Sequence, residues 1–483
     1  MNKKRNRFVN KEQVQHKTNS QKSIYRVTYV FASLFVLMVG YYMYFLIFNS
    51  NDIVNNTYNQ RHGVLAIRVT RGSIFDSEGN VLAETLTNED GKEKRIYPYD
   101  DLFVHVVGRT QEGRSGLEGI ENIRMLTSDI NPIEHMYSEL VGEKNPGNNI
   151  ITTLNTKLQK AAHEALGDNR GAVVVLEPST GKILSMVSKP GYNPNDVKQI
   201  WPEIMEDKKK ESPLINRATQ GLYPPGSTFK LVTSLAFIRE NPDYMNYQHD
   251  CKGSIKHEGM TISCYGKSVH GKIDLKTAFA KSCNTFYSSF GQKMDRNQLF
   301  NICESLMLNK ELPISMAHSP SRFALNSGDG SIKEAMHTAI GQGRTLMSPL
   351  NNAMIAATVA NSGVMMKPYV VDRVESADGI IVKNYDPKPI GEPMTGAEAN
   401  YLSSLMEEVV LEGTGRKLND LKVTVAGKTG SAEVEGKDDH AWFIGFAPVE
   451  NPQIAFCILV ENVGSSSENA VPIAKELVET YFE

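Results

Sequence analysis

The sequence has 483 residues, enough for two or three domains, and its 40% hydrophobic and 22% charged residues exclude a disordered chain. The net charge is -3, but residues 1–26 carry eight basic residues and one acidic residue, so the rest of the chain carries -10. A mildly acidic body of this kind argues against nucleic-acid binding.

A membrane anchor is predicted for residues 27–48, which contain no charged side chain. At about 1.5 Å per residue, a helix of this length crosses the roughly 30 Å hydrocarbon core of a bilayer. Tyr41, Tyr42 and Tyr44 lie near its far end, where an aromatic belt is expected. The basic tail, residues 1–26, should stay in the cytoplasm, which makes a single-pass protein with an extracytoplasmic body. A cleavable signal peptide is the alternative, but no small-residue cleavage site follows.

A small module is predicted for residues 49–149, after the anchor. Residues 64–70 and 81–85 have the pattern of two strands, and the glycine and asparagine before the second strand suit a hairpin. Residues 133–141 have the pattern of a helix. Residues 144–148 contain proline and glycine and mark a boundary.

A larger domain is predicted for residues 150–483. Helical spacing appears first at residues 155–166, and the domain closes with a helix at 470–482. Strands are predicted near both ends of the domain, at residues 172–176, 183–187, 441–447 and 454–460. Strands at both ends with helices between them predict one mixed sheet covered by helices, an α/β (α+β) fold.

Five cysteines are too few for a disulfide scaffold. Cys251 and Cys264 flank a hairpin-like stretch, and an extracytoplasmic location would permit a bond between them, so both the bonded and the free form stay open. Cys283, Cys303 and Cys457 have apolar or helical surroundings and are predicted to be free, buried thiols. The histidines show no spacing typical of a metal site, so no metal is predicted.

A nucleophilic serine is suggested by the pattern S-x-x-K, because a serine hydroxyl reacts only when a nearby base removes its proton. The pattern occurs at Ser179 with Lys182 and at Ser227 with Lys230. The first pair lies in a turn between two predicted strands and is interpreted as structural. Ser227 begins an apolar helix over residues 228–239, and a helix N-terminus favours developing negative charge. Taken alone, Ser227 could equally be a helix N-cap.

Two further motifs favour the catalytic interpretation. Ser282 and Asn284 form S-x-N, and residues 428–430 form K-T-G. Together with S-x-x-K they match the signature of penicillin-binding proteins and class A β-lactamases. Cys283 stands where the β-lactamases have aspartate, and residues 467–469 match S-x-N by chance.

The chain resembles the class B penicillin-binding proteins, monofunctional D,D-transpeptidases of bacterial cell-wall synthesis, in their compact-pedestal form. The resemblance implies a pedestal over residues 49–149 and, over 150–483, a serine β-lactamase-like transpeptidase domain with a central antiparallel sheet. The similar segments are residues 71–76, 116–118, 176–181, 223–230, 281–284, 341–343, 428–430 and 441–443.

The resemblance implies roles for the reacting groups. Ser227 attacks the carbonyl of the penultimate D-Ala of a stem peptide, and neutral Lys230 accepts its proton. Ser282 passes the proton to the leaving amine, and Asn284 orients Lys230. A lysine that works as a base near pH 7 needs a pKa about 3 units below the usual value, for which burial and the charge of Lys428 are the expected causes.

The resemblance also implies how the substrate is held. Lys428 and Thr429 bind the terminal carboxylate of the D-Ala-D-Ala stem peptide, and Gly430 lets the substrate strand approach. Backbone N–H groups of Ser227 and Ser431 stabilise the tetrahedral intermediate. β-Lactams should acylate Ser227, and no cofactor is implied.

Several alternatives stay open. A D,D-carboxypeptidase, a β-lactamase or a β-lactam-binding sensor would carry the same motifs. A nucleotide-binding loop ending at residues 427–429 is disfavoured because position 422 is lysine and not glycine. The resemblance also implies that the pedestal, together with the membrane helix, contacts a SEDS-family glycosyltransferase. Arg71 and Asp76 in the pedestal could instead pair with each other.

Overall fold

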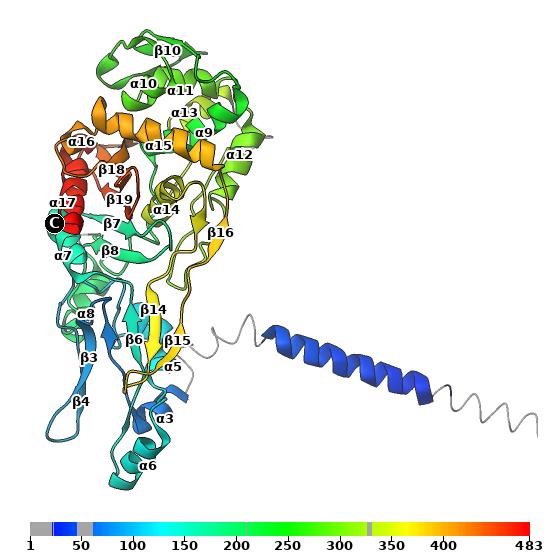
Figure 1. The fold of residues 1–483 in the computed structure, drawn as a ribbon, viewed down its shortest axis with the longest axis vertical. Coiled ribbons are helices and arrows are strands. Elements are labelled where there is room, and N and C mark those ends of the chain that lie inside the picture. The colour runs from blue at the N-terminus through cyan, green and yellow to red at the C-terminus, as the bar shows by residue number, and fades with distance from the viewer. Residues whose placement is uncertain (1–21, 23, 46–60, 209, 326–330) are drawn as a thin grey trace, which may run out of the picture. The chain divides into compact units, whose positions relative to one another are not determined.

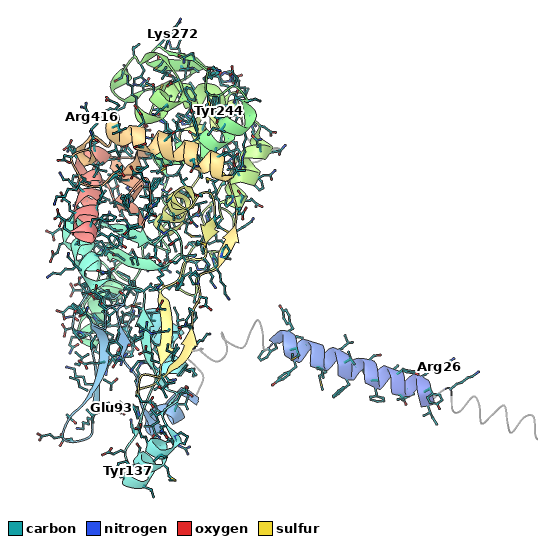
Figure 2. The ribbon with its side chains drawn as sticks, viewed as in Figure 1. Arg26, Glu93, Tyr137, Tyr244, Lys272 and Arg416 are labelled. Carbon is teal, nitrogen blue, oxygen red and sulfur yellow. The ribbon has the colours of Figure 1, made fainter. Side chains whose placement is uncertain are left out.

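The computed structural model describes residues 22, 24–45, 61–208, 210–325 and 331–483, and it divides into two compact units, Met1–Arg61 and His62–Glu483 (Figure 1). The first unit contains a helix of 22 residues, Ile24–Phe45, long and apolar enough to cross a membrane. Its side chains project on all sides, with Arg26 near one end (Figure 2). The predicted span 27–48 overlaps this helix, and its last three residues lie outside the described part of the chain.

The second unit contains a six-stranded sheet in the order β15-β14-β6-β2-β3-β4. β6 lies inside it, parallel to β2 and antiparallel to β14. This sheet therefore joins the pedestal to a part of the chain more than two hundred residues later. The added strands stabilise the pedestal hairpin, which would be barely stable in water by itself. The strands are β2 (Ile74–Phe75), β3 (Val81–Thr87), β4 (Glu93–Ile96), β6 (Asn149–Thr152), β14 (Val371–Glu375) and β15 (Ile381–Asn384).

The predicted turn, its returning strand and one predicted helix of the pedestal are confirmed, but the first strand of the hairpin is Ile74–Phe75 and not residues 64–70. β2 pairs with β3, and helix α6 (Pro132–Val141) ends at Gly142 with positive φ. The strand predicted over residues 64–70 is wrong for all but its last two residues. Helix α3 (Arg61–Arg68) occupies most of that segment, and β1 (Val69–Thr70) pairs with β5 (Asn145–Pro146). A short apolar run does not by itself distinguish a helix from a strand.

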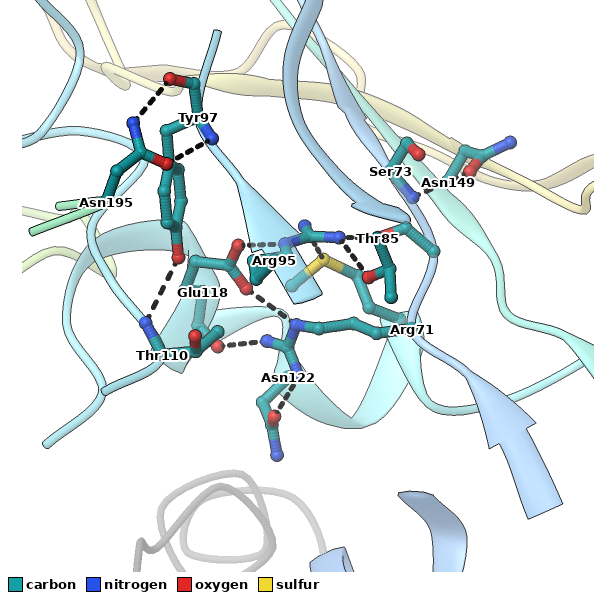
Figure 3. A network of polar contacts seen from close by, with 12 residues as sticks. Arg71, Ser73, Thr85, Arg95, Tyr97, Thr110, Glu118, Asn122, Asn149 and Asn195 are labelled. Atoms are coloured by element: carbon teal, nitrogen blue, oxygen red, sulfur yellow. Dashed lines mark hydrogen bonds and ion pairs between the residues drawn. The ribbon is translucent and has the colours of Figure 1, made fainter. Parts of the chain in front are cut away.

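Charged residues of the pedestal form a buried network (Figure 3). The fully buried Glu118 carboxylate accepts a hydrogen bond from Nε of Arg71 at 2.6 Å and from Nε of Arg95 at 2.6 Å. The predicted pairing of Arg71 with Asp76 is wrong, because Asp76 accepts hydrogen bonds from the backbone N–H of Asn80 and from the Thr156 hydroxyl instead. Both residues therefore have structural partners within the described chain.

The five-stranded sheet of the larger domain is antiparallel throughout, in the order β17-β18-β19-β7-β8, which confirms the predicted central antiparallel sheet. Helices α7 (Thr156–Leu166) and α17 (Val471–Phe482) pack on one face and α14 (Pro349–Ala360) on the other (Figure 1). All residues of the inner strands β7 and β19 are buried, as expected for a covered sheet. The strands are β7 (Gly171–Leu176), β8 (Ile183–Lys189), β17 (Ala426–Val434), β18 (Lys437–Ala447) and β19 (Ile454–Val460).

A helical region lies at the end of this unit opposite to α6 (Figure 1). Helix α9 (Lys230–Glu240) runs through it and buries nine consecutive residues from Lys230 to Ile238. Around it lie α10 (Leu275–Ala280), α11 (Asn284–Gly291), α12 (Arg296–Ser305), α13 (Ile332–Ala339) and α15 (Gly396–Leu411). Small strand pairs complete this end: β9 (His249–Cys251) with β12 (Gly271–Ile273), and β10 (Ser254–His257) with β11 (Met260–Ser263).

The remaining elements are short or peripheral. They are α4 (Gly116–Ile120), α5 (Asn122–Met125), α8 (Val197–Glu206), α16 (Ser466–Asn469), β13 (Met365–Met366), β16 (Pro389–Gly391) and the 3₁₀ turns η1 (Gly226–Phe229), η2 (Tyr265–Lys267) and η3 (Arg416–Leu418).

Candidate active site

Ser227 lies in a single 3₁₀ turn, η1, which leads directly into α9. Lys230 is the first residue of α9, one turn after Ser227, and is fully buried, whereas Ser227 is half-buried. The predicted helix over residues 228–239 is confirmed, with a tighter first turn than expected. A serine one turn before a buried lysine at the start of a helix has the placement that S-x-x-K requires.

Gly226 allows this turn to lie against strand β17. Its φ is +54°, and a Cβ atom there would lie 2.4 Å from the carbonyl oxygen of Ser431. Its N–H donates to the carbonyl of Gly341 at 3.0 Å. A side chain at this position would therefore push η1 away from the strand that carries K-T-G.

The Lys230 ammonium group is enclosed by the S-x-N motif. Nζ donates to the backbone carbonyl of Ser282 at 2.9 Å, to its Oγ at 3.1 Å and to Oδ1 of Asn284 at 2.6 Å. Ser282 itself has φ of +51°, an uncommon value for serine of the kind that functional sites tolerate. Burial lowers the pKa of Lys230 to about 7, so the amine exchanges its proton near neutral pH.

Lys428 on β17 is the second buried cation of the site. Its Nζ donates to the carbonyl of Thr429 at 3.1 Å and lies 5.5 Å from the ring centre of Phe279. Burial, and then the charge of Lys230, lower the pKa of Lys428 well below its usual value. Burial was an expected cause of the lowered pKa of Lys230 and is its main cause, while the repulsion between the two lysines contributes to the lowered pKa of Lys428.

The rest of the K-T-G strand is held by hydroxyl groups that lie outside the three motifs. Ser466 Oγ donates to the carbonyl of Gly430 at 2.6 Å and lies 3.0 Å from Oγ of Ser431. The hydroxyls of Thr414 and Thr429 hydrogen-bond each other. Neither Ser466 nor Thr414 belongs to a recognisable motif; Ser466 directly precedes the chance S-x-N match.

Gly430 is required by close packing. A Cβ atom there would lie 2.8 Å from Cγ2 of Thr228 and 3.0 Å from the carbonyl oxygen of Pro225. Strand β17 and the serine turn are therefore in direct contact. The structure thus brings S-x-x-K, S-x-N and K-T-G together from three distant parts of the chain.

The competing motif matches lie elsewhere. Ser179 is exposed in the turn between β7 and β8, and Lys182 pairs with Asp372 at 3.1 Å, so this pair is structural as predicted. Gly427 and Lys428 lie within a β-strand and not in a loop before a helix, which excludes a phosphate-binding loop there.

The cysteines next to this site settle the alternative that was left open for Cys251 and Cys264. Cys251 and Cys264 are both free, with their sulfur atoms 3.7 Å apart, so the possible disulfide is not formed. Cys283, the middle residue of S-x-N, has its sulfur 3.8 Å from that of Cys264, and His270 Nδ1 lies 3.3 Å from Cys251 Sγ. These four residues could hold a metal ion. The motif patterns did not indicate this group, because Cys251 and Cys264 were considered only as a possible disulfide and Cys283 as a free thiol, although all four residues fall within 251–283.

The family model of the penicillin binding protein transpeptidase domain matches residues 171–479. The chain is 31% identical to the peptidoglycan D,D-transpeptidase PbpA of Mycolicibacterium smegmatis, over 92% of this chain and 94% of that protein. The chain belongs to the class B penicillin-binding proteins. A more distant relative is the peptidoglycan D,D-transpeptidase MrdA of Acinetobacter baumannii, 28% identical over 78% of this chain and 65% of the relative.

Solved structures of penicillin-binding proteins have the same fold. Penicillin-binding protein A from M. tuberculosis, in its imipenem acyl-enzyme complex, is 30% identical with a TM-score of 0.80, covering 87% of this chain and 100% of that one. The D,D-transpeptidase domain of a peptidoglycan glycosyltransferase from Eggerthella lenta is 31% identical with a TM-score of 0.76, over 86% and 98% of the two chains. The predicted fold is confirmed, and the apolar N-terminal helix fits a membrane protein.

Proposed function

We propose that this peptidoglycan D,D-transpeptidase works through an acyl-enzyme on Ser227, with Lys230 as the general base. The observation that carries the proposal is the environment of Lys230. Its amine is fully buried, has a pKa of about 7, and contacts both polar residues of S-x-N one turn after the serine. A neutral amine in this position can take the serine proton, whereas an ordinary lysine would be charged.

In the proposed acylation these groups act in turn. Ser227 Oγ attacks the carbonyl of the penultimate D-Ala and gives its proton to Lys230. Ser282 Oγ, 3.1 Å from Lys230 Nζ, passes the proton to the departing D-Ala amine as the peptide bond breaks. Asn284 Oδ1 accepts a hydrogen bond from Nζ and keeps the amine oriented. β-Lactams acylate the same serine, and the acyl group stays attached.

Substrate binding falls to strand β17. It is an edge strand of the five-stranded sheet, so an extended peptide can add to it as a further strand, and Gly430 has no side chain to obstruct this. The terminal carboxylate binds Lys428 and Thr429, and its negative charge favours the protonated form of Lys428. The backbone N–H groups of Ser227 and Ser431 stabilise the oxyanion.

The second half of the reaction transfers the acyl group to an amine of a neighbouring stem peptide, which forms the crosslink. A D,D-carboxypeptidase would use water instead. Incubating the protein with a D-Ala-D-Ala peptide and an amine acceptor separates the two by product analysis. Exclusive hydrolysis at saturating acceptor would exclude the transpeptidase.

The nucleophile is tested with a fluorescent penicillin on the full-length protein in detergent. Ser227→Ala should abolish covalent labelling, and peptide mapping of the native protein should find the label at residue 227. The matched control is Ser179→Ala, which removes the serine of the other S-x-x-K pattern and should label normally. Labelling that persists in Ser227→Ala would refute the assignment.

The orientation and the membrane partner belong to the same proposal. The basic residues before the anchor support a cytoplasmic N-terminus and an extracytoplasmic catalytic domain. Helix α6 exposes Ile133, Met136, Tyr137 and Leu140, which supports contact of the pedestal with a SEDS-family glycosyltransferase.

A photo-crosslinking side chain tests the contact. Placed at Tyr137 it should capture a co-expressed SEDS protein, while the same group at Lys272, at the other end of this unit, should not (Figure 2). Equal capture at both positions, or none at Tyr137, would exclude this surface. For the orientation, an impermeant thiol reagent should reach a cysteine placed at Lys272 in intact cells.

A further inference from the structure

Four metal-ligating side chains converge beside the catalytic motif. The Cys251, Cys264 and Cys283 sulfurs and a ring nitrogen of His270 all lie within 4.8 Å of one another. The three cysteines are buried and His270 is half-buried. They come from four places: the end of β9, the residue after β11, the residue before β12 and the N-cap of α11.

The distances match a tetrahedral zinc site. Two sulfurs that are each about 2.3 Å from a tetrahedral zinc ion lie about 3.8 Å apart, and a sulfur and a histidine nitrogen about 3.6 Å apart. The observed separations are 3.7 Å for Cys251 and Cys264, 3.8 Å for Cys264 and Cys283, and 3.3 Å for Cys251 and His270. A disulfide would need about 2.05 Å between sulfurs, so the arrangement suits a shared ion better than a bond.

The segment that supplies three of these ligands has little hydrophobic core. Between His249 and Asp274 the buried residues other than glycine are Cys251, Ile262, Cys264 and Ile273, while Tyr265 and Val269 are exposed. Its strands form only two separate two-stranded pairs. Small modules of this kind usually need a disulfide or a structural metal to be stable.

The fourth ligand connects the cluster to the catalytic base. Cys283 lies between Ser282 and Asn284, which both contact Lys230. Asn284 also donates to the carbonyl of Ser263, the residue before Cys264, at 2.8 Å. Asn284 is therefore next to one cluster cysteine in the sequence, Cys283, and is hydrogen-bonded to the residue that precedes another, Cys264.

A hydroxyl group lies next to one of the cluster sulfurs. The Thr285 hydroxyl, which is buried, lies 3.2 Å from Cys283 Sγ and can donate to it. Hydrogen bonds to sulfur stabilise the thiolate form that a metal requires. Three cysteines and one histidine, with no open position, are typical of a structural zinc site and not of a catalytic one.

We infer that Cys251, Cys264, His270 and Cys283 bind one structural Zn²⁺, which holds the S-x-N motif in place for acylation. On binding, the three thiols lose their protons and His270 binds as the neutral imidazole, so no electron transfer is involved. The claim that these residues bind zinc does not depend on the proposed function. The claim that zinc supports acylation does depend on the proposed function.

Metal content is the first test. Full-length protein should be purified in detergent with reductant and without chelator. Inductively coupled plasma mass spectrometry should then find about one zinc ion per chain. Cys251→Ser combined with His270→Ala should lower this at least tenfold. The control Cys303→Ser removes a buried thiol of α12, outside the cluster, and should retain the zinc.

Cobalt provides a readout that does not depend on the variants. Protein depleted of zinc and reloaded with Co²⁺ should show sulfur-to-cobalt charge-transfer absorption of a tetrahedral site, and one equivalent of zinc should remove it. Less than a tenth of a zinc per chain, even after incubation with added zinc under reductant, would overturn the inference. So would full zinc content in the double variant.

The coupling to acylation is measured on the same samples. Removing zinc should lower the limiting rate constant of acylation by fluorescent penicillin at least tenfold. The dissociation constant of the non-covalent complex should change less than threefold, because Lys428 and Thr429 lie on β17. Added zinc should restore the rate. Unchanged acylation in zinc-free protein would overturn the positioning role, whereas labelling of Ser227→Ala would overturn the proposed function and leave the zinc content untouched.

Discussion

Two of the sites where the described chain buries charge are built in opposite ways. In the pedestal, Glu118 is enclosed by Arg71 and Arg95, each with Nε 2.6 Å from a carboxylate oxygen (Figure 3). In the catalytic domain, Lys230 and Lys428 are both fully buried. Across the described residues, no carboxylate forms an ion pair with either of these two lysines.

The difference distinguishes a buried charge that stabilises the fold from a buried charge that is suited to proton transfer. Burial by itself would raise the pKa of Glu118, but the charges and hydrogen bonds of Arg71 and Arg95 outweigh it and hold that pKa below its usual value. The charged form is thus stable, and the network ties β4 to α4. Burial without a paired carboxylate lowers the pKa of Lys230 to about 7 instead. Perturbed lysines of this kind are typical of catalytic sites.

The largest effect is expected from Lys230→Met, which keeps the volume of the side chain and removes the base. The acylation rate constant should fall about 10²- to 10⁴-fold, the usual contribution of a general base. Stopped-flow or gel-based labelling with fluorescent penicillin measures it. Lys182→Met, in the structural S-x-x-K pair, is the matched control, and a similar loss there would mean that the two lysines do not differ.

A substitution in the pedestal network should lower the stability of the protein and leave its acylation rate unchanged. Glu118→Gln leaves two buried guanidinium groups without their carboxylate, which should lower the free energy of unfolding by about 3 to 5 kcal/mol. Denaturant unfolding measures this, and acylation per folded molecule should stay within twofold. The exposed pair of Lys160 with Glu164 supplies the control, since Glu164→Gln should cost less than about 1 kcal/mol. A Glu118→Gln protein of normal stability would contradict the structural role.

Lys428 tests the binding half of the catalytic pair. Lys428→Met removes the cation that is proposed to hold the substrate carboxylate, a charged hydrogen bond that contributes about 1.5 to 3 kcal/mol. The dissociation constant of a β-lactam in the non-covalent complex should therefore rise about 10- to 100-fold. If only the limiting rate of acylation changed, Lys428 would belong to the proton-transfer machinery and not to carboxylate binding.

The pH dependence sharpens the comparison further. Lys230 acts as a base only when neutral, and its pKa is about 7, so the acylation rate should rise with pH through about 7 and level off above it. Below that pKa the rate should fall about tenfold per pH unit, because the neutral fraction falls by that factor. A rate that stays flat from pH 5 to 8 would exclude Lys230 as the titrating base.

The candidate site could be predicted from the sequence because each motif is a short local pattern. Ser227 and Lys230 are one helical turn apart, and their proximity needs no knowledge of the rest of the chain. The strands β7 and β19 were equally visible as continuous apolar runs. The strand predicted over residues 64–70 failed because the same kind of run also suits helix α3.

The sequence by itself determined which chemistry is present: a serine with a nearby lysine, an amide, a second lysine, and an apolar anchor long enough for a membrane. Tertiary structure decided what local patterns cannot contain. Only the fold put Glu118 between two arginines, buried Lys230 and Lys428 near each other, and drew three cysteines and His270 together beside Asn284. Burial and distance between residues far apart in the chain set these properties, and both arise only when the chain is folded.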